Sequence, residues 1–229
     1  MRYYPWIEDD TPFPPVESAD THGILAIGGE LTTDRLLDAY SRAIFPWYDE
    51  GQPVIWWSPD PRFVLFPRNL CVSKTMRQVL RRGVFEIRFD TAFRDVISSC
   101  AETPRRHERG TWITPDMIDA YCELHRQGYA HSVEAWRGGK LVGGLYGVSL
   151  GGVFFGESMF TRESNASKAA FITLVEKLID KGFTLIDSQV HTGHLASLGA
   201  EEIPRTRYLE LLTEGLGKET LKGNWGIIL

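Results

Sequence analysis

A single carboxylate interrupts an apolar stretch of this chain. Residues 153–160 read VFFGESMF, in which Glu157 stands among bulky apolar and small residues. Such a carboxylate is costly to desolvate unless a cation or hydrogen-bond donors pair with it. Two interpretations follow from the residues alone. Glu157 either binds an incoming cation or is satisfied internally, by an arginine such as Arg162 or by backbone donors.

A second polar pair, Asp187 and Gln189, lies in the run FTLIDSQV, residues 183–190, which has the composition of a β-strand. Residues i and i+2 of a strand project from the same face, so we expect these two side chains to lie side by side. A carboxylate beside an amide can orient an amine and stabilise its charge. The alternative for an isolated D-x-Q is a strand-end acid that caps a loop.

Metal and disulfide chemistry have little support. His191 and His194 form an H-x-x-H pair without a neighbouring carboxylate ligand, so we assign no metal site. The cysteines Cys71, Cys100 and Cys122 are widely spaced and contain no C-x-x-C pair, which argues against a disulfide framework and a cysteine zinc site. We expect no cofactor.

The net charge of −5 conceals an asymmetry along the chain. Residues 1–61 contain 3 Lys+Arg against 11 Asp+Glu, residues 62–109 contain 11 against 5, and residues 110–229 contain 11 against 14. A basic middle between acidic flanks favours a protein that docks a polyanion at one place and recognises a cation elsewhere.

Part of the basic segment is spaced so that several cations share one face of a helix. The residues of this basic helix face are Lys74, Arg77, Arg81 and Arg82. Contacts to phosphate there would hold a nucleic acid without reading its sequence. A solvated surface helix is the other interpretation. A second basic cluster, RRHERG at 105–110, is expected in a loop.

The chain has the composition of a globular protein. No apolar run approaches the ~18–20 residues that a membrane span requires. The first residues carry neither a signal-peptide core nor the arginines of a transit peptide. We therefore expect a cytoplasmic protein that does not enter a membrane.

The distribution of proline suggests two parts of the chain with different structure. Nine of the 12 prolines lie at or before Pro67, so the first third should be rich in loops, with one helix within residues 31–45 capped by Thr32 or Thr33. Longer regular elements begin at about residue 62. We predict a small N-terminal domain, 1–61, and a larger domain, 62–229.

The larger domain should be of the α+β class. A helix is predicted from the N-cap Thr114, which precedes a proline, to Gly128. The remaining predicted elements, in order, are antiparallel strands at 131–137, 141–149 and 153–160, a helix from an Asn165 cap to Gly182, a strand at 183–190 and a helix near 205–215.

This succession resembles the acyltransferase fold of the GNAT superfamily, which has a mixed, largely antiparallel sheet flanked by helices. Acyl-CoA binds there at the start of the helix after the central strand, where a Gly-rich loop presents backbone N–H groups to the pyrophosphate. The corresponding residues 162–170, RESNASKAA, contain no glycine. A GNAT-type N-acetyltransferase using acetyl-CoA is therefore an alternative that this stretch disfavours.

A set of motifs between Gly23 and Arg205 resembles the bacterial leucyl/phenylalanyl-tRNA–protein transferases. The motifs are GILAIGGELT, IFPWY, WWSPDPR, GTWIT, AHSVEAWR, LVGGLYGV, FFGESMF, NASK, LIDSQV and HLASLGAEEIPR. Ala43 departs from the family, which often has glycine before IFPW, and we expect it to alter only a turn. The resemblance implies transfer of leucine or phenylalanine from Leu-tRNA or Phe-tRNA to acceptor proteins with N-terminal Arg or Lys, which marks them for degradation.

The resemblance also implies roles for the polar residues. Glu157 would face the N-terminus of the acceptor, because a carboxylate suits an ammonium or guanidinium group. Gln189 would orient the attacking amine and Asp187 would stabilise its charge, since a neutral amide oxygen is an acceptor and not a useful base. A third class of function is a non-catalytic receptor that recognises basic N-termini through Glu157.

Two tryptophans in family motifs, Trp47 and Trp112, are implied to stack on the terminal adenine of the tRNA. Core packing is the alternative for any tryptophan. We expect Trp56 and Trp57 to form the hydrophobic join between the two domains.

The resemblance further implies an apolar pocket for the leucine or phenylalanine side chain. The aligned positions are Leu145, Phe154, Phe171, Leu174, Leu178 and Ile186. Periodicity alone would place all of them in the core. A hydrophobic pocket discriminates by only ~1–3 kcal/mol per methylene, so methionine should be a weak third donor.

Overall fold

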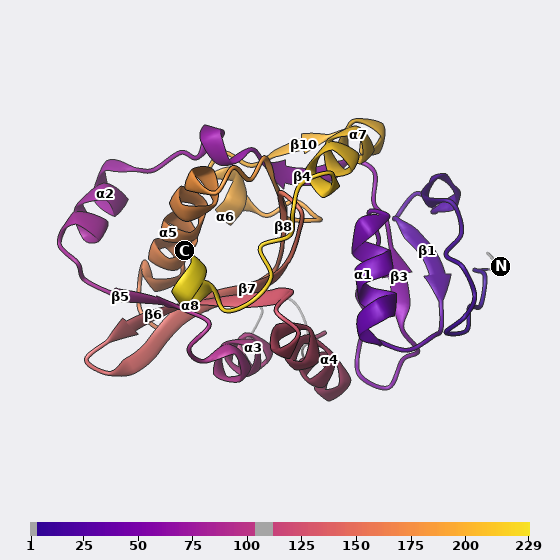
Figure 1. Ribbon diagram of the computed structural model, residues 1–229, viewed down its shortest axis with the longest axis horizontal. Helices are drawn as coiled ribbons and strands as arrows, with labels where there is room; N and C mark the ends of the chain where they lie inside the picture. Colours follow the sequence, from indigo (N-terminus) through magenta and orange to yellow (C-terminus); the bar gives the residue numbers. More distant parts are fainter. Residues whose placement is uncertain (1–3, 104–111) are drawn as a thin grey trace.

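The structure is a computed structural model that describes residues 4–103 and 112–229 (Figure 1). Its N-terminal part holds a three-stranded antiparallel sheet of order β1-β3-β2. The elements are η1 (Val16–Ser18), β1 (Ile24–Ile27), α1 (Thr33–Ser41), β2 (Phe45–Pro46) and β3 (Ile55–Trp57). Thr32 caps α1 by accepting a hydrogen bond from the Arg35 backbone N–H, which confirms one of the two predicted caps.

The rest of the chain forms a seven-stranded sheet of order β10-β4-β9-β8-β7-β6-β5. Its strands are β4 (Arg62–Leu65), β5 (Glu86–Phe89), β6 (Ala130–Arg137), β7 (Lys140–Leu150), β8 (Val153–Thr161), β9 (Leu185–Asp187) and β10 (Glu201–Ile203). The pair of β8 and β9 is parallel and the other pairs are antiparallel. The predicted α+β class, small N-terminal part and mixed, mostly antiparallel sheet are confirmed.

Helices cover both faces of the large sheet (Figure 1). The long helix α5 (Ala166–Asp180) packs on β6 and β7 from one side, and α3 (Phe93–Glu102) and α4 (Pro115–Arg126) pack on the sheet from the other. The remaining helices are η2 (Pro67–Asn69), α2 (Lys74–Arg81), α6 (Gly193–Ala196), α7 (Arg205–Leu216) and α8 (Trp225–Ile228). Among the described residues, no helix is both long and apolar enough to cross a membrane.

Two local predictions about helix caps have different outcomes. Thr114 caps α4 as predicted, since its side chain accepts a hydrogen bond from the Met117 backbone N–H. Asn165 precedes α5 but its side chain makes no capping hydrogen bond, and its backbone is left-handed with φ of 72°. The predicted Asn165 side-chain cap is therefore wrong. Asparagine tolerates this left-handed conformation better than most residues do.

The antiparallel meander of β6, β7 and β8 is confirmed, with one irregularity. Tyr146 pairs with Ser158, and the next residue, Gly147, pairs with Gly156, so Glu157 is an extra residue in β8. A bulge of this kind bends the strand and re-aims a side chain. The bulge therefore lies at the single acidic residue of the strand.

The N-terminal part shares its apolar core with one face of the large sheet. Leu36 and Tyr40 of α1 belong to the same buried cluster as Tyr121 of α4 and Phe155 of β8. The rings of Tyr40 and Phe155 have centroids 4.9 Å apart. The domain boundary near residue 62 remains a prediction, but the two parts pack against each other through this cluster.

Trp56, which was predicted to join the two domains, belongs to the buried cluster that the two parts share, and its ring and hydrogen-bond partners are local. It is completely buried, its ring lies 4.8 Å from that of Phe13, and its indole N–H donates to the Gly28 carbonyl at 2.8 Å. All of these contacts lie within the N-terminal part. Trp57 packs against Trp47, with ring centroids 5.4 Å apart.

Candidate functional site

A cavity of about 530 Å³ opens between the N-terminal part and the large sheet. One wall is Phe45, Pro46 and Trp47, which are β2 and the residue after it. The opposite wall comes from β7, β8, the first half of α5 and the segment that follows β9. The cavity is therefore completed only when distant parts of the chain come together.

The apolar wall contains three of the six predicted pocket residues. Leu145, Phe154 and Phe171 line the cavity. Leu174, Leu178 and Ile186 belong to the same hydrophobic cluster but are completely buried and do not line it. Sequence reasoning missed Met159 and Leu195, which also line the cavity. Met159 stands in VFFGESMF, so its proximity to Glu157 was a usable signal.

Glu157 lies in the cavity wall and is half-buried. Its Oε2 accepts a hydrogen bond from the Tyr121 hydroxyl at 3.1 Å, and its Oε1 accepts one from the Gln189 side-chain amide at 3.2 Å. Burial raises the pKa of Glu157 to about 7, although the tyrosine hydroxyls lower it. A carboxyl group with this pKa is poised to change its charge near neutral pH.

Two tyrosines support Glu157, and sequence reasoning missed both. The hydroxyl groups of Tyr40 on α1 and Tyr121 on α4 are hydrogen-bonded to each other. Burial and the charge of Glu157 raise the pKa values of both tyrosines well above their usual value, so both remain protonated donors. No spacing pattern links residues 40, 121 and 157, because their proximity arises only in the tertiary structure.

Arg162, the arginine considered as an alternative partner of Glu157, bonds other residues. Arg162 donates to the Ser99 hydroxyl at 3.1 Å and lies 3.6 Å from Glu102. Within residues 4–103 and 112–229, no ion pair involves Glu157. In that part of the chain its carboxylate has hydrogen-bond donors but no cation held against it.

Asp187 is completely buried and does not line the cavity. Its two oxygens accept hydrogen bonds from Arg62, Nε to Oδ1 at 2.8 Å and Nη2 to Oδ2 at 2.6 Å. The Tyr208 hydroxyl donates to Oδ2 at 2.7 Å. Burial lowers the pKa of Arg62, but Asp187 and Tyr208 together raise it above its usual value, so the guanidinium stays charged. Asp187 thus forms a fully paired internal group.

Gln189 lies beyond the strand, so the predicted shared strand face is wrong. β9 ends at Asp187, and Gln189 has a left-handed backbone with φ of 55°. Its backbone N–H donates to Asp187 Oδ1 at 2.9 Å, and its carbonyl accepts from the Phe63 N–H at 3.2 Å. These bonds hold its side-chain amide in the cavity beside Glu157. Asp187 and Gln189 are therefore in contact, but through the backbone N–H of Gln189 and not through their side chains.

Both tryptophans predicted to stack on adenine, Trp47 and Trp112, line the cavity. The Trp57 indole N–H donates to the Trp47 carbonyl at 2.6 Å, which fixes the backbone at that position. His194 also lines the cavity, and burial and Lys168 lower its pKa. Among the described residues, no group of three or more His, Cys, Asp or Glu side chains could hold a metal.

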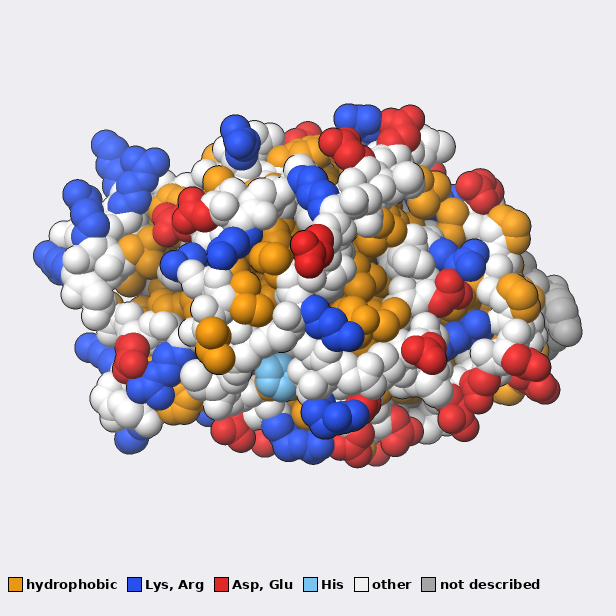
Figure 2. Space-filling view, in the orientation of Figure 1, with side chains coloured by type: hydrophobic (Ala, Val, Ile, Leu, Met, Phe, Trp, Pro, Cys, Tyr) orange, Lys and Arg blue, Asp and Glu red, His pale blue; other side chains and the backbone are white. Residues whose placement is uncertain are grey.

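The basic helix face lies on α2, at one end of the molecule. Lys74, Arg77 and Arg81 are exposed on this helix, and Arg82 is exposed at its C-cap. Figure 2 shows blue side chains gathered at the left of the molecule, where Figure 1 places α2. The second predicted basic cluster, 105–110, lies outside the described residues.

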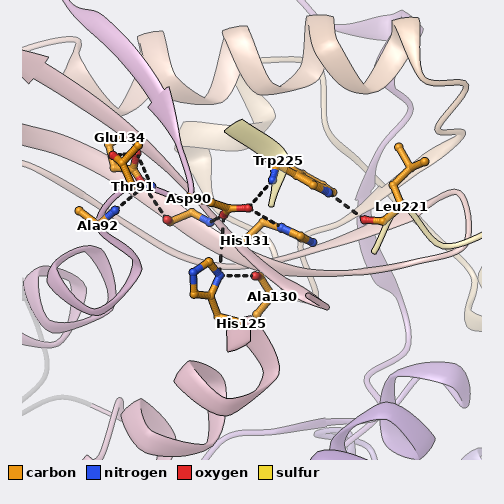
Figure 3. A network of polar contacts seen from close by, with 10 residues as sticks. Asp90, Thr91, Ala92, His125, Ala130, His131, Glu134, Leu221 and Trp225 are labelled. Carbon is orange, nitrogen blue, oxygen red and sulfur yellow. Dashed lines mark hydrogen bonds and ion pairs between the residues drawn. The ribbon is translucent and has the colours of Figure 1, made fainter. Parts of the chain in front are cut away.

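A separate polar network fixes the C-terminal segment and does not reach the cavity (Figure 3). Asp90 accepts hydrogen bonds from His131 Nδ1 at 2.9 Å and from the Trp225 backbone N–H at 2.7 Å. The His131 ring stacks on Trp225 with centroids 3.8 Å apart. This network ties α8 to β6 and to the turn after β5, which is a structural role.

Models of two protein families match most of the chain. A family described as "Leucyl/phenylalanyl-tRNA protein transferase" matches residues 64–213, and its N-terminal domain matches residues 29–60. The leucyl/phenylalanyl-tRNA–protein transferase of Myxococcus xanthus is 54% identical over 96% of this chain and 94% of its own. The enzyme of that name from Syntrophobacter fumaroxidans is 56% identical over 93% and 91%.

Solved structures offer more distant likenesses. A GCN5-related N-acetyltransferase from Kribbella flavida has a TM-score of 0.40 and 12% identity, covering 76% of this chain and 61% of that one. The L-PGS structure from Bacillus licheniformis has a TM-score of 0.37 and 14% identity, covering 76% and 57%.

Proposed function

We propose that this chain, which belongs to the leucyl/phenylalanyl-tRNA protein transferase family, transfers leucine or phenylalanine, and methionine weakly, to proteins with an N-terminal arginine or lysine. The donor of such a transferase is an aminoacyl-tRNA and the acceptor is a protein. We further propose that the transfer takes place in the cytoplasm and marks the acceptor for degradation.

One juxtaposition carries this proposal. The same cavity presents an apolar wall of Leu145, Phe154 and Phe171 and, beside it, the carboxyl group of Glu157. The apolar wall suits an uncharged side chain such as that of leucine or phenylalanine. The carboxylate suits the ammonium or guanidinium group of an N-terminal lysine or arginine. Both partners of the reaction can therefore meet in one place.

The proposed reaction needs little beyond positioning. The acceptor amine attacks the carbonyl carbon of the ester, the new C–N bond forms, and the C–O bond to the ribose breaks. The amine nitrogen loses one proton and the leaving ribose oxygen gains one, so the products are an amide and a free ribose hydroxyl. An α-amino group has an unperturbed pKa of ~7.7–8, so part of it is already neutral near pH 7. We assign Gln189 to orienting the amine and Asp187 to holding Gln189, because Asp187 bonds its backbone N–H and not the cavity.

Phe-tRNA labelled in the amino acid, mixed with a peptide that begins with arginine, tests the function. Transfer of the label to the peptide is expected. A requirement for acetyl-CoA would favour an N-acetyltransferase, and binding of the peptide without product would favour a receptor. A peptide beginning with glutamate is the matched control, since Glu157 should repel it.

The basic helix face should hold the tRNA through its phosphates. Replacing Arg77, Arg81 and Arg82 together by alanine is expected to lower the slope of log affinity against log salt by about 1 per arginine that contacts phosphate. Binding of Phe-tRNA at several salt concentrations measures this slope. Replacement of three exposed arginines on other elements, Arg126, Arg137 and Arg207, is the control. An unchanged slope in the first variant would mean that this helix face is only solvated and does not contact the tRNA.

Binding of a cation in the cavity should depend on pH. Because the pKa of Glu157 is raised to about 7, its carboxylate is mostly protonated below that pH and charged above it. The affinity for agmatine, which stays cationic in this range, should therefore rise as the pH rises through about 7. Calorimetry with the wild type and Glu157→Gln measures the effect. A similar rise in the glutamine variant would assign it to another group, such as His194.

A further inference from the structure

Arg62 links the two walls of the cavity. Its guanidinium carbon lies over the rings of Phe45 and Tyr208, 4.8 Å and 4.7 Å from their centroids. The residue is only 1% exposed. Besides its two hydrogen bonds to Asp187, it donates from Nη1 to the Ala43 carbonyl at 3.2 Å. One planar group thus contacts residues 43 and 45, at or just before the start of β2, and residue 187, which is far from both in the sequence.

Each residue that Arg62 contacts is linked in turn to a residue that lines the cavity. On one side, Asp187 holds the backbone of Gln189, whose amide donates to Glu157. On the other side, Ala43 lies two residues before Phe45, where β2 begins and leads to Trp47. Ala43 has φ of 65°, and the following segment turns from α1 into β2. The position of Arg62 therefore bears on both walls.

Stability alone does not account for this choice of residues. A buried ion pair is costly to desolvate, and well-packed apolar residues of similar volume are often as stable or more so. A guanidinium, however, is a rigid fork with donors in fixed directions, so it can hold a carboxylate and a backbone carbonyl in one plane. Lysine carries the same charge but lacks this fixed geometry.

We propose that Arg62 is a positioning residue that sets the wall bearing Phe45 and Trp47 relative to the wall bearing Gln189 and Glu157. This inference rests on the proposed function. In the reaction, the terminal nucleoside of the donor contacts the first wall and its ester lies at the second. Arg62 touches neither substrate. It acts by fixing the separation at which the ester meets the acceptor amine.

Steady-state transfer of phenylalanine to an Arg-initiated peptide separates this role from a merely structural one. Arg62→Lys keeps the charge but loses the fork, so kcat should fall and the KM for Phe-tRNA should rise, each by about 10-fold or more. Tyr208→Phe removes one hydrogen bond to Asp187 and leaves the contacts of Arg62 to Asp187 and Ala43 in place. Its kcat should fall while the KM for Phe-tRNA stays unchanged.

The possible outcomes are distinct. A wild-type protein that transfers nothing would overturn the proposed function. If the wild type is active and Arg62→Lys lowers kcat without changing the KM for Phe-tRNA, the role of Arg62 alone is overturned. A smaller folded fraction would produce that same result. If Arg62→Lys does not fold, Asp187→Asn takes its place, since it weakens the anchor of Arg62 while keeping the size of a side chain that does not itself line the cavity. It should then change kcat and the KM for Phe-tRNA together, and an unchanged KM would overturn the proposal.

Discussion

Glu157→Gln is expected to lower kcat/KM for an Arg-initiated acceptor by at least about 30-fold and to leave the KM for Phe-tRNA unchanged. Truncating one partner of a buried, hydrogen-bonded charge pair costs about 2–5 kcal/mol, and about 1.4 kcal/mol corresponds to a factor of 10. Glutamine keeps the shape of the side chain and can still meet Tyr121, but it has no charge for the incoming cation. Steady-state kinetics with each substrate varied in turn measures both quantities.

A matched control for this variant is Glu134→Gln. Glu134 is buried and, like Glu157, has its pKa raised by burial, but it accepts hydrogen bonds from Ser132 and Thr91 and does not line the cavity. Its replacement should leave the acceptor kcat/KM near the wild-type value in the folded protein. Equal losses for donor and acceptor in Glu157→Gln would contradict the assigned role of Glu157.

Gly147→Ala should strongly destabilise the fold and impair the cavity. A Cβ atom at this position would lie 2.2 Å from the Phe155 carbonyl oxygen and 2.5 Å from the ring of Phe154. Protein interiors are close-packed and overpacking typically costs about 1–3 kcal/mol, with more where backbone must move. Denaturant unfolding monitored by circular dichroism should show this loss. Because Phe154 lines the cavity, transfer of phenylalanine should fall as well.

The cross-strand partner of Gly147 provides the control. Gly156 pairs directly with Gly147 in the β7–β8 ladder, but a Cβ there would meet its nearest atoms only at 3.7 Å and 3.9 Å. These are ordinary van der Waals contacts, so Gly156→Ala should change the free energy of unfolding by about 0.5 kcal/mol or less. Similar losses for the two variants would show that the crowding at Gly147 is relieved by a backbone shift.

Local patterns in the sequence predicted the helices α1, α4, α5 and α7 and the strands β6, β7 and β8. The threonine and proline at 114–115 and the glycine at 128 bracket α4, because capping and termination depend on the residues at the helix ends themselves. Three apolar runs separated by glycine turns predicted the meander of β6, β7 and β8. The strand predicted at 183–190 was too long, because the pairing of Phe63 with Ser188 and Gln189 replaces a regular ladder by a left-handed turn.

In the candidate site, too, some features could be predicted from local sequence and others depend on the fold. An isolated Glu157 in an apolar run already implied that the acid needs a partner, since desolvation depends on its immediate surroundings. Which partners satisfy it was decided by the fold. Tyr121 and Gln189 reach Glu157 from 36 and 32 residues away. Leu174, Leu178 and Ile186 share the periodicity of the cavity residues, and only packing separates them from Leu145, Phe154 and Phe171.

The sequence by itself determined the helices α1, α4, α5 and α7, the strands β6, β7 and β8, the isolated acid Glu157 and the motifs of a transferase family. Only the tertiary structure decided that Asp187 forms an ion pair with Arg62, 125 residues before it in the chain. It also decided that, of Asp187 and Gln189, only Gln189 lines the cavity. The physical reason is the separation in sequence over which each interaction acts. Capping, periodicity and turns depend on neighbours within a few residues, whereas a buried ion pair depends on which strands lie side by side in the sheet.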